Sequence, residues 1–368
     1  MILGQLELLN YKNLESISLK ASPRVNFIIG ANGIGKTNLL DCIYYTGMTR
    51  SYFSSSDKLI CRKNQNFFRI EGRYFEQSLE HQLVVKVAPG SIKEFEWDGQ
   101  QLERATEHIG RIPVVFVSPD DIFSFIQESS SRRSFLDQSL VQVDADYLRE
   151  LTSYNRLLKQ RSAILKLGYQ QGLDTLLDSY DLQMIEPANA IYQKRKAMVL
   201  ALNPLLDQLS LLFSGEEQSS VLKYQSDAEE NLFELWKTDR MRDKISGRVN
   251  SGIHRDKLIP EFNHGSLKEF GSQGQIKTFI LALRIAQYEY LNQMSGMKPI
   301  LLLDELFAQL DGQRVEALIK YLASEHTGQC FITDNYLNRA VELKDQIGLE
   351  SCIFELRHNE LNIYEKNQ

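Results

Sequence analysis

One stretch near the N-terminus decides the fold, namely Gly30-Ala31-Asn32-Gly33-Ile34-Gly35-Lys36-Thr37. It fits the pattern GxxxxGK[ST], in which glycines let backbone N–H groups approach a phosphate chain that bulky side chains would obstruct. In this pattern the lysine neutralises the β- and γ-phosphates, and the hydroxyl holds a magnesium ion. The sequence therefore predicts a P-loop for ATP, formed by this stretch and the following Asn38.

The residues on both sides of this stretch supply the context that a P-loop requires. Val25-Asn26-Phe27-Ile28-Ile29 is a short apolar run typical of a buried strand, and Leu39, Leu40 and Ile43 share one face of a predicted helix. A glycine loop between a strand and a helix N-terminus binds anions through free N–H groups. The alternative, a plain glycine turn with a surface lysine, leaves this context unexplained.

A second apolar run, Ile300-Leu301-Leu302-Leu303, ends in the acidic pair Asp304-Glu305. A P-loop needs an acidic strand end to complete its magnesium site. We expect Asp304 to hold the magnesium ion with Thr37, directly or through water, and Glu305 to orient or deprotonate the attacking water. The alternative is two carboxylates that simply end a strand at the surface, and the P-loop motif makes that alternative weaker.

A third motif, Ser272-Gln273-Gly274-Gln275, opens a predicted buried helix over 274–292. Small residues at a helix N-terminus offer N–H groups and the positive end of the helix dipole to an anion. The motif is similar to the signature motif of ATP-binding cassette proteins, and Ala308-Gln309-Leu310-Asp311 is similar to their D-loop. In that family the signature motif completes the ATP site of a second subunit, so the likeness implies an ATP-dependent homodimer.

Composition sets limits on the class of protein. The chain has 368 residues and a formal charge of 42 − 48 = −6, so nucleic-acid binding must use a local basic patch. Its four cysteines include no CxxC pair, which argues against a zinc ribbon and a disulfide scaffold. The N-terminus does not read as a signal peptide, and no window approaches 18 uninterrupted apolar residues. These features predict a cytoplasmic protein.

The pattern of the chain changes after residue 117. Strand-like runs almost vanish, and Leu148, Leu151, Leu158 and Leu165 keep helical spacing. A second helical pattern is predicted to break near Pro204. We predict an α/β fold in which 1–117 and 246–368 form a split ATP-binding cassette lobe and 118–245 forms a mostly helical inserted arm.

The spacing of the motifs favours one branch of the cassette proteins. Lys36 and Gly274 lie 274 − 36 = 238 residues apart, far more than in transporter ATPases, and a helical arm between two half-sites is similar to the heads of SMC-like ATPases. Within that branch the chain resembles the RecF family along nearly its whole length. The segments that carry this resemblance are 29–40 around the P-loop, Ser118-Pro119-Asp120-Asp121, Arg132-Arg133-Ser134-Phe135-Leu136-Asp137, 154–161, Gly252-Ile253-His254-Arg255-Asp256 and 272–275.

The resemblance implies a function in replication-linked DNA repair. ATP and magnesium would join two chains on gapped or single-stranded/double-stranded DNA, and slow hydrolysis by a weak DNA-stimulated ATPase would release them. RecO and RecR are the implied partners, and RecA loading is the implied outcome. The residues that contact DNA are not identified by this reasoning.

Two other functions remain as alternatives. One is the ATPase subunit of a transporter, against which the 238-residue separation and the arm argue. The other is the ATPase partner of a nuclease. Only 368 − 304 = 64 residues follow Asp304, too few for a fused nuclease domain.

Several charged groups have two open interpretations. His254, Arg255 and Asp256 either sense nucleotide or form a structural trio, and Arg132-Arg133 either face phosphate or pair with nearby carboxylates. Tyr11-Lys12-Asn13 lie beside adenine or form a simple turn. Basic clusters near Arg195 and Arg240 contact DNA or are solvated helix faces, and the second interpretation is favoured.

Overall fold

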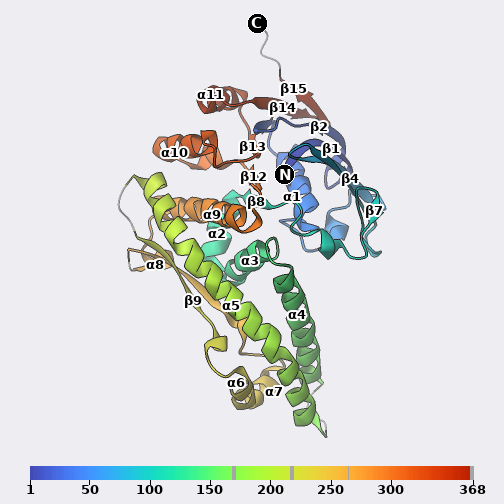
Figure 1. Ribbon diagram of the computed structural model, residues 1–368, viewed down its shortest axis with the longest axis vertical. Helices are drawn as coiled ribbons and strands as arrows, with labels where there is room; N and C mark the ends of the chain where they lie inside the picture. Colours follow the sequence, from blue (N-terminus) through green and yellow to red (C-terminus); the bar gives the residue numbers. More distant parts are fainter. Residues whose placement is uncertain (168–170, 216–218, 264, 365–368) are drawn as a thin grey trace. The chain divides into compact units, whose positions relative to one another are not determined.

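The computed structural model describes residues 1–167, 171–215, 219–263 and 265–364 (Figure 1). The chain divides into two compact units, which we call the P-loop unit and the arm unit. The P-loop unit comprises Met1–Phe123, Leu209–Glu217 and Gln273–Gln368; the arm unit comprises Ser124–Gln208 and Gln218–Ser272. The division differs from the expected arm of 118–245 at both ends, since the arm unit begins at Ser124 and ends at Ser272. It also assigns Leu209–Glu217 to the P-loop unit.

The P-loop unit is built on a six-stranded sheet of order β15-β14-β3-β13-β12-β8. Its strands are β3 (Val25–Ile29), β8 (Val114–Val117), β12 (Ile300–Leu303), β13 (Cys330–Asp334), β14 (Ser351–Arg357) and β15 (Glu360–Ile363). All neighbours pair in parallel except β15 with β14. Strands β3, β8, β12 and β13 are buried at every position, as expected for parallel strands covered on both faces.

A second sheet in the same unit is antiparallel, with the order β2-β1-β4-β5-β6-β7. Its strands are β1 (Ile2–Tyr11), β2 (Leu14–Lys20), β4 (Phe68–Glu76), β5 (Leu79–Val87), β6 (Glu94–Trp97) and β7 (Gln100–Gln101). A tight turn joins β6 to β7, with φ of 52° at Asp98 and 78° at Gly99. Two positive φ values in a two-residue loop are those of a type I′ turn, which matches the twist of a hairpin.

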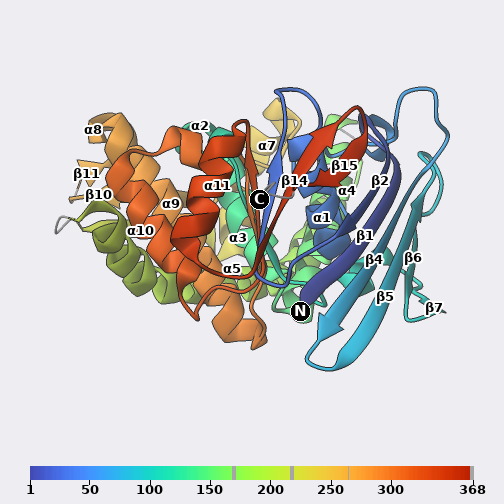
Figure 2. The same ribbon diagram turned by 90° about the horizontal axis from the view of Figure 1, so that it is seen from above.

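Helices cover the parallel sheet of the P-loop unit on both faces. Helix α1 (Lys36–Met48) contacts β1 and β4 of one sheet and β8 and β13 of the other, and Figure 2 shows it between the two sheets. Helices α9 (Gln273–Ser295), α10 (Gly312–Ala323) and α11 (Leu337–Ile347) lie on the opposite side of the parallel sheet (Figure 2). Helix α2 (Pro119–Gln127) follows β8, and short 3₁₀ turns lie at Asp57–Leu59, Ala105–His108 and Leu306–Gln309.

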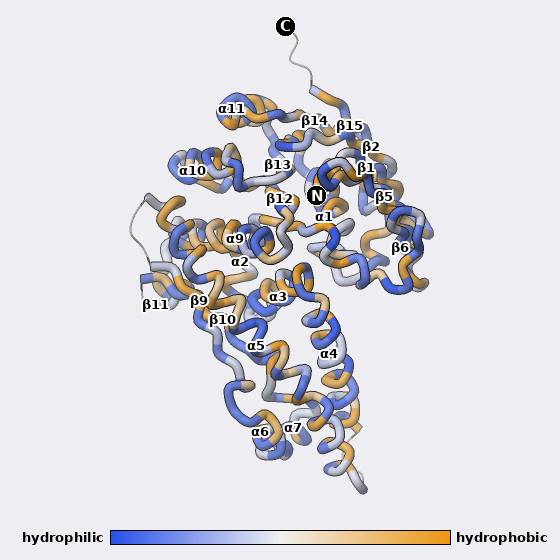
Figure 3. The backbone as a smooth tube through the Cα atoms, in the orientation of Figure 1, coloured by the Kyte–Doolittle hydropathy of each residue, from blue (hydrophilic) through white to orange (hydrophobic). Residues whose placement is uncertain are grey.

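The arm unit is organised around a helical hairpin. Helix α3 (Ser129–Leu140) leads into α4 (Ala145–Lys166), and α5 (Leu173–Ser214) runs back along it. Ion pairs fix the antiparallel direction, because Lys194 lies 2.7 Å from Asp144 at one end and Arg161 lies 2.6 Å from Asp181 at the other. In Figure 3 both long helices alternate between hydrophobic and hydrophilic segments, as amphipathic helices do.

The predicted break at Pro204 is wrong, because α5 continues to Ser214. Proline removes one backbone hydrogen bond, but Leu202 and Leu206 on either side of it are fully buried and hold the helix in place. The adjacent Asn203 also binds the backbone of Leu222, donating to its carbonyl at 3.1 Å and accepting from its N–H at 2.8 Å. Tertiary packing therefore outweighs the local signal of the proline.

Helix α5 is long and apolar enough to cross a membrane by length and composition alone. Its charged residues argue for a protein interior instead. Asp181 is fully buried against Arg161, and Arg195 is buried against Asp137 and Asp256. We therefore interpret α5 as a core helix of the arm.

A small antiparallel sheet of order β11-β10-β9 completes the arm unit. Strand β9 (Ser220–Gln225) pairs along its whole length with β10 (Lys257–Phe262), and β11 is Gly265–Ser266. This pairing explains the late unit boundary, because it ties residues after 246 to a strand of the arm. The remaining elements are α6 (Leu232–Thr238), α7 (Arg240–Ser246), α8 (Leu267–Phe270) and 3₁₀ turns at Asp227–Glu229 and Ile253–Arg255.

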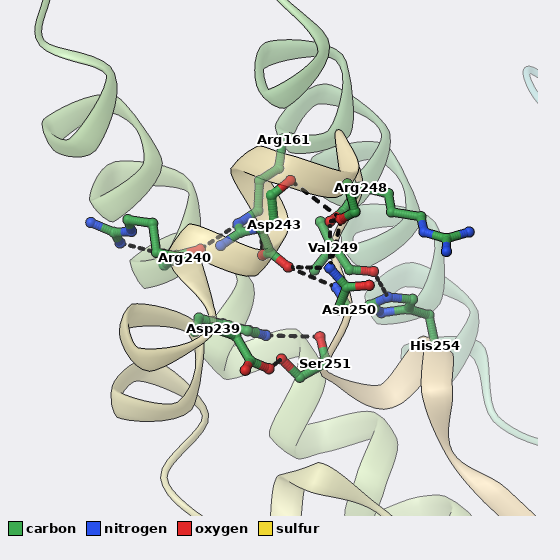
Figure 4. Close-up of polar contacts among 12 residues, drawn as sticks. Arg161, Asp239, Arg240, Asp243, Arg248, Val249, Asn250, Ser251 and His254 are labelled. Atoms are coloured by element: carbon green, nitrogen blue, oxygen red, sulfur yellow. Dashed lines mark hydrogen bonds and ion pairs between the residues drawn. The ribbon is translucent and has the colours of Figure 1, made fainter. Parts of the chain in front are cut away.

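Buried charges, rather than apolar contacts alone, join these elements. The Arg161 guanidinium of α4 is fully buried and lies 2.6 Å from Asp181 of α5 and 2.7 Å from Asp243 of α7. Asp243 also accepts hydrogen bonds from the backbone N–H and the side chain of Asn250, at 3.0 and 2.8 Å. Figure 4 shows Asp243 between Arg161 and Asn250. A buried charge of this kind is tolerated only while its partners remain.

We predict that Asp243→Ala lowers the free energy of unfolding of the arm by about 3–5 kcal/mol, because it removes a partner of a fully buried guanidinium. The measurement is urea unfolding in a Trp97→Phe background, followed by the fluorescence of Trp236, which is buried in the arm and donates to the Ser251 carbonyl at 2.9 Å. The control is Asp146→Ala, which breaks only the exposed pair with Arg149 and should change stability little. Equal effects of the two variants would contradict this account.

Candidate nucleotide site

The predicted P-loop connects the end of β3 to the start of α1 and has the backbone that its glycines permit. Gly33 and Gly35 have φ of 75° and 122°, which side-chain-bearing residues rarely adopt. At Gly35 there is also no room, because an added Cβ would lie 2.6 Å from a methyl carbon of Leu14 and 2.9 Å from the Asn13 side chain. Ala31, Asn32 and Gly33 are exposed, so the loop presents its backbone outward.

The Lys36 ammonium lies at the centre of this loop. It donates to the carbonyls of Gly30 and Ala31 at 3.0 and 3.2 Å and to Oδ1 of Asn335 at 2.7 Å. It also lies 3.2 Å from a carboxylate oxygen of Glu305. The lysine side chain is nearly fully buried, so its charge is directed at the loop rather than at bulk solvent.

Asp304 at the end of β12 meets the first turn of α1. Its carboxylate accepts from the Thr37 hydroxyl at 2.9 Å and from the Thr333 hydroxyl at 2.7 Å. Burial raises the pKa of the Asp304 carboxyl, hydrogen bonds from Thr333 and Thr37 lower it, and the charge of Glu305 raises it again. A nearby cation would favour the ionised form of such a carboxyl.

Glu305 follows directly in an unusual backbone conformation. Its φ is 46°, in the left-handed region that a non-glycine residue adopts only where the surroundings enforce it. Its N–H donates to the Thr333 hydroxyl at 2.9 Å, and its carboxylate faces Lys36. Thr333 therefore binds the Asp304 carboxylate with its hydroxyl hydrogen and the Glu305 backbone N–H with its oxygen, which fixes the Asp304 carboxylate and the Glu305 backbone relative to each other.

The oxygen groups at this site suit a magnesium ion. Thr37 and Asp304 offer a hydroxyl and a carboxylate, the ligand types that magnesium prefers. Within the described part of the chain, no group of three or more histidine, cysteine, aspartate or glutamate side chains forms a metal cluster. Magnesium commonly combines one or two protein ligands with phosphate oxygens and water, so two protein groups are sufficient here.

The turn between β1 and β2 lies against the P-loop. The Asn13 side chain donates to the Ile34 carbonyl at 3.0 Å and accepts from Asn38 at 2.7 Å. Lys12 and Asn13 line a groove of about 840 Å³ together with residues from the loop after α1, among them Lys58 and Arg62. Lys12 itself lies 2.7 Å from buried Asp41. The expected position of this turn beside the nucleotide is compatible with this geometry.

One residue of the signature motif, Gly274, lies close to the D-loop residue Asp311, and Arg314 lies between them. An added Cβ at Gly274 would lie 3.4 Å from the Arg314 guanidinium, which donates to Thr278 at 2.6 Å and forms an ion pair with Asp311. Asp311 also caps α10 by accepting from the Arg314 N–H at 3.1 Å. Ser272 and Gln273 are exposed, whereas Gly274 and Gln275 are half-buried. The structure thus links Gly274 to Asp311, and Ser272 belongs to the arm unit.

The signature helix is also tied to the segment after β8. Arg284 of α9 lies 2.8 Å from Asp121 and donates to the Tyr52 hydroxyl at 2.7 Å, and Tyr52 in turn donates to Asp121. All three side chains are largely buried. This network gives the Ser118-Pro119-Asp120-Asp121 segment a structural role within the P-loop unit.

Most of the weaker charge signals have structural roles. His254 has a hydrogen bond from each ring nitrogen, to the Val249 carbonyl at 3.1 Å and to the Tyr154 hydroxyl at 2.9 Å. Arg132 donates to the carbonyls of Phe125 and Ile126 at 2.7 and 3.1 Å, which satisfies the end of α2. Arg195 and Arg240 form ion pairs with carboxylates of the arm.

Sequence patterns alone do not reveal Thr333 and Asn335, which bind Asp304 and Lys36. One signal could have identified them. Thr333 directly follows the apolar run Cys330-Phe331-Ile332, and Asn335 lies two residues further on. Polar residues at the carboxyl ends of parallel strands often face a ligand site. The missing information was that this strand lies directly between β3 and β12.

Comparison with known sequences agrees with this geometry. The family model described as RecF/RecN/SMC N terminal domain matches residues 2–349. A protein of Azobacteroides pseudotrichonymphae named DNA replication and repair protein RecF is 37% identical over 335 residues, covering 91% of this chain and 92% of that relative. A Bacteroides fragilis protein of the same name is 34% identical and covers both chains fully, at 100% each.

Solved structures show the same fold. The recombination mediator protein RecF with ATP superposes with a TM-score of 0.88 at 25% identity, covering 99% of this chain and 98% of that one. A Smc head domain from Pyrococcus furiosus has a TM-score of 0.56 at 14% identity, covering 99% and 96%, which is evidence for the fold alone. The expected α/β fold of an SMC-like cassette ATPase is therefore confirmed.

Proposed function

Since this chain belongs to the RecF family of DNA replication and repair proteins, we propose that it is an ATP-dependent DNA-binding protein that dimerises on ATP. One observation supports this most strongly: Lys36, Thr37, Asp304 and Glu305 come together at the carboxyl ends of β3 and β12. A lysine, a hydroxyl and two carboxylates around a glycine loop are the groups that ATP binding and hydrolysis require.

In this proposal the triphosphate lies along the backbone of residues 30–38. Lys36 neutralises the β- and γ-phosphates, and Thr37 and Asp304 hold the magnesium ion, which supplies further positive charge to the phosphates when bound. Glu305 orients the attacking water and accepts its proton. The adenosine half extends toward the groove beside Lys12 and Asn13, because that groove borders the P-loop.

The second half of each site is supplied by another copy of the chain. Helix α9 begins at Gln273, directly after Ser272, and the positive end of a helix dipole favours an anion. Ser272 and Gln273 are exposed and so accessible to a partner subunit. Arg314 connects Asp311 to this segment, because its guanidinium pairs with Asp311 and lies next to Gly274. A nucleotide that contacts both subunits binds the dimer better than the monomer and therefore stabilises the dimer.

ATP turnover then acts as a switch rather than as a source of work. The dimer binds gapped or single-stranded/double-stranded DNA, and slow DNA-stimulated hydrolysis releases it. Family membership supports RecO and RecR as partners and RecA loading as the outcome, in the cytoplasm. A transporter ATPase would instead bind a membrane subunit, and the ATPase partner of a nuclease would stimulate cleavage. DNA binding with and without ATP tests against the transporter ATPase, and a metal-dependent cleavage assay on gapped DNA tests against the nuclease partner.

Mixing two inactive variants tests whether each ATP site is shared between two subunits. A Lys36→Ala homodimer has two dead sites, and so does a Ser272→Arg homodimer, in which a bulky charged side chain blocks the phosphate. A mixed dimer carries both lesions in one site and none in the other. Random pairing of equal amounts makes about half of the dimers mixed, so the mixture should regain part of the ATPase.

The mixing assay needs high protein concentration, because Lys36→Ala weakens one of the two ATP contacts that hold the dimer. Differently tagged chains report whether mixed dimers form. Mixed dimers that form and stay as inactive as either parent would refute the model of two independent shared sites. Full ATPase activity of Ser272→Arg alone would show that residues 272–275 are not the signature motif.

A further inference from the structure

The loop after α1 borders a groove of about 770 Å³, which we call the basic groove. Its lining consists of residues 55–58, residues 61–66, Pro89 and Gly90. Lys58 and residues 61–65 also line the groove beside Lys12 and Asn13, so the two grooves adjoin. The basic groove therefore lies next to the candidate nucleotide site, within the P-loop unit.

Backbone hydrogen bonds fix the loop of the basic groove to the turn between β1 and β2. The Lys12 N–H donates to the Ile60 carbonyl at 2.6 Å, and the Arg62 N–H donates to the Asn10 carbonyl at 2.9 Å. The Ile60 side chain is almost fully buried and anchors the loop in the core. The fold therefore holds this loop in place, so little backbone freedom is lost when a ligand binds.

Two cations at the basic groove have carboxylate partners. Arg62 of the lining lies 2.8 Å from Glu15. Asp57, the one carboxylate of the lining, lies 3.1 Å from Lys93. Each of these two pairs is neutral, so neither of them attracts an anion by itself.

Lys58 and Lys63 carry the unbalanced charge. Both side chains are exposed and line the groove, and across the described parts of the chain neither forms an ion pair with a carboxylate within 4.0 Å. The lining and its ion-pair partners therefore hold four cations against two carboxylates, a surplus of two positive charges. An ammonium has three N–H donors and no acceptor, so both lysines are suited to an anion.

The nucleotide of the proposed function does not neutralise this surplus. Its triphosphate lies along residues 30–38, where Lys36 and the magnesium ion balance its charge. The adenosine half, which extends toward the adjoining groove, is uncharged. The two lysines are therefore available to a different anionic ligand.

We propose that the basic groove binds the sugar–phosphate backbone of DNA, with Lys58 and Lys63 as phosphate ligands. Every lining residue except Cys61, Pro89 and Gly90 has a polar or charged side chain, and protein–DNA interfaces are more polar and more positively charged than protein–protein interfaces. Lysine, serine, asparagine and glutamine side chains contact DNA phosphates without reading sequence. A chain with a net charge of −6 needs such a local positive site to hold DNA. This inference rests on the proposed function and assigns a DNA contact to the P-loop unit.

The test replaces both unpaired lysines at once. Lys58→Gln/Lys63→Gln removes two positive charges from exposed positions and leaves the buried anchor of the loop intact. The matched control is Lys20→Gln/Lys86→Gln, which removes two exposed lysines of β2 and β5 in the same unit and changes the net charge equally. Binding to fluorescent gapped duplex DNA is measured with ATP over a range of salt concentrations.

We expect Lys58→Gln/Lys63→Gln to weaken DNA binding about tenfold or more and to reduce the slope of log K against log salt by about two, because each phosphate contact contributes about 0.9 to that slope. The control should stay within about twofold of the parent with an unchanged slope. Lys58→Arg/Lys63→Arg should bind DNA as the parent does, because it keeps both charges. All three proteins should keep the ATP affinity and the melting temperature of the parent.

The outcomes separate this inference from the proposed function. If the parent binds DNA with ATP and Lys58→Gln/Lys63→Gln behaves as the control, the basic groove is not a DNA contact and the proposed function stands. A parent that does not bind DNA removes the proposed function and this inference with it. If the glutamine variant loses ATP affinity as strongly as DNA affinity, the two lysines serve the nucleotide, which overturns the inference. Loss of RecR binding at unchanged DNA affinity would assign the groove to an acidic protein surface and overturn it as well.

Discussion

Lys36→Ala is expected to abolish ATP-dependent DNA binding while the fold survives. The ammonium contacts two P-loop carbonyls, Asn335 and Glu305, so its loss removes the positive charge that the β- and γ-phosphates need. Truncating one partner of a buried charge pair typically costs about 2–5 kcal/mol, which is a loss of ATP affinity from roughly 30-fold to several thousandfold. Equilibrium binding of a fluorescent ATP analogue measures this directly.

The control for this variant is Lys20→Ala, which removes an exposed lysine at the end of β2 in the same unit. It should bind ATP and DNA as the parent does. Thermal melting of both variants shows whether the P-loop unit stays folded. Unchanged nucleotide affinity in Lys36→Ala would refute the assignment of the P-loop.

Glu305→Gln is expected to bind ATP and to hydrolyse it about 10²–10⁴-fold more slowly, so that dimers accumulate. The amide keeps the shape of the side chain and loses the basicity that proton transfer from water requires. It also ends the ion pair with Lys36, which leaves the ammonium available to the phosphates. Single-turnover hydrolysis and the mass of the ATP-bound species are the two measurements.

Glu316→Gln serves as the matched control, because Glu316 is an exposed glutamate of α10 that pairs with Lys320. Its turnover should equal that of the parent. If Glu305→Gln hydrolysed ATP at the parental rate, another group would have to activate the water, and the role of Glu305 would be limited to the ion pair with Lys36.

The sequence predicted the elements that local patterns encode. The P-loop, the strand ending in Asp304 and the helix that begins after Ser272 each combine a short motif with the right periodicity. These features depend on neighbours in the chain, so they can be recognised without knowing the tertiary contacts.

Features that depend on distant partners could not be predicted in this way. The pairing of β9 with β10 joins segments more than thirty residues apart, and it moves the unit boundary from 246 to 273. The continuation of α5 past Pro204 depends on the burial of its neighbours. Thr333 and Asn335 carry no motif, and only the strand order brings them to the candidate nucleotide site.

The ion pair between Lys36 and Glu305 sets the order of ATP binding and hydrolysis in the proposed mechanism. While the ammonium contacts the glutamate, that carboxylate oxygen is engaged and is not free to take a proton from water. In the proposed mechanism the incoming γ-phosphate competes for the same ammonium, so ATP binding releases the Glu305 carboxylate that then accepts the proton from water. In the proposed mechanism hydrolysis therefore follows the full seating of ATP, which gives each DNA-bound dimer a minimum lifetime.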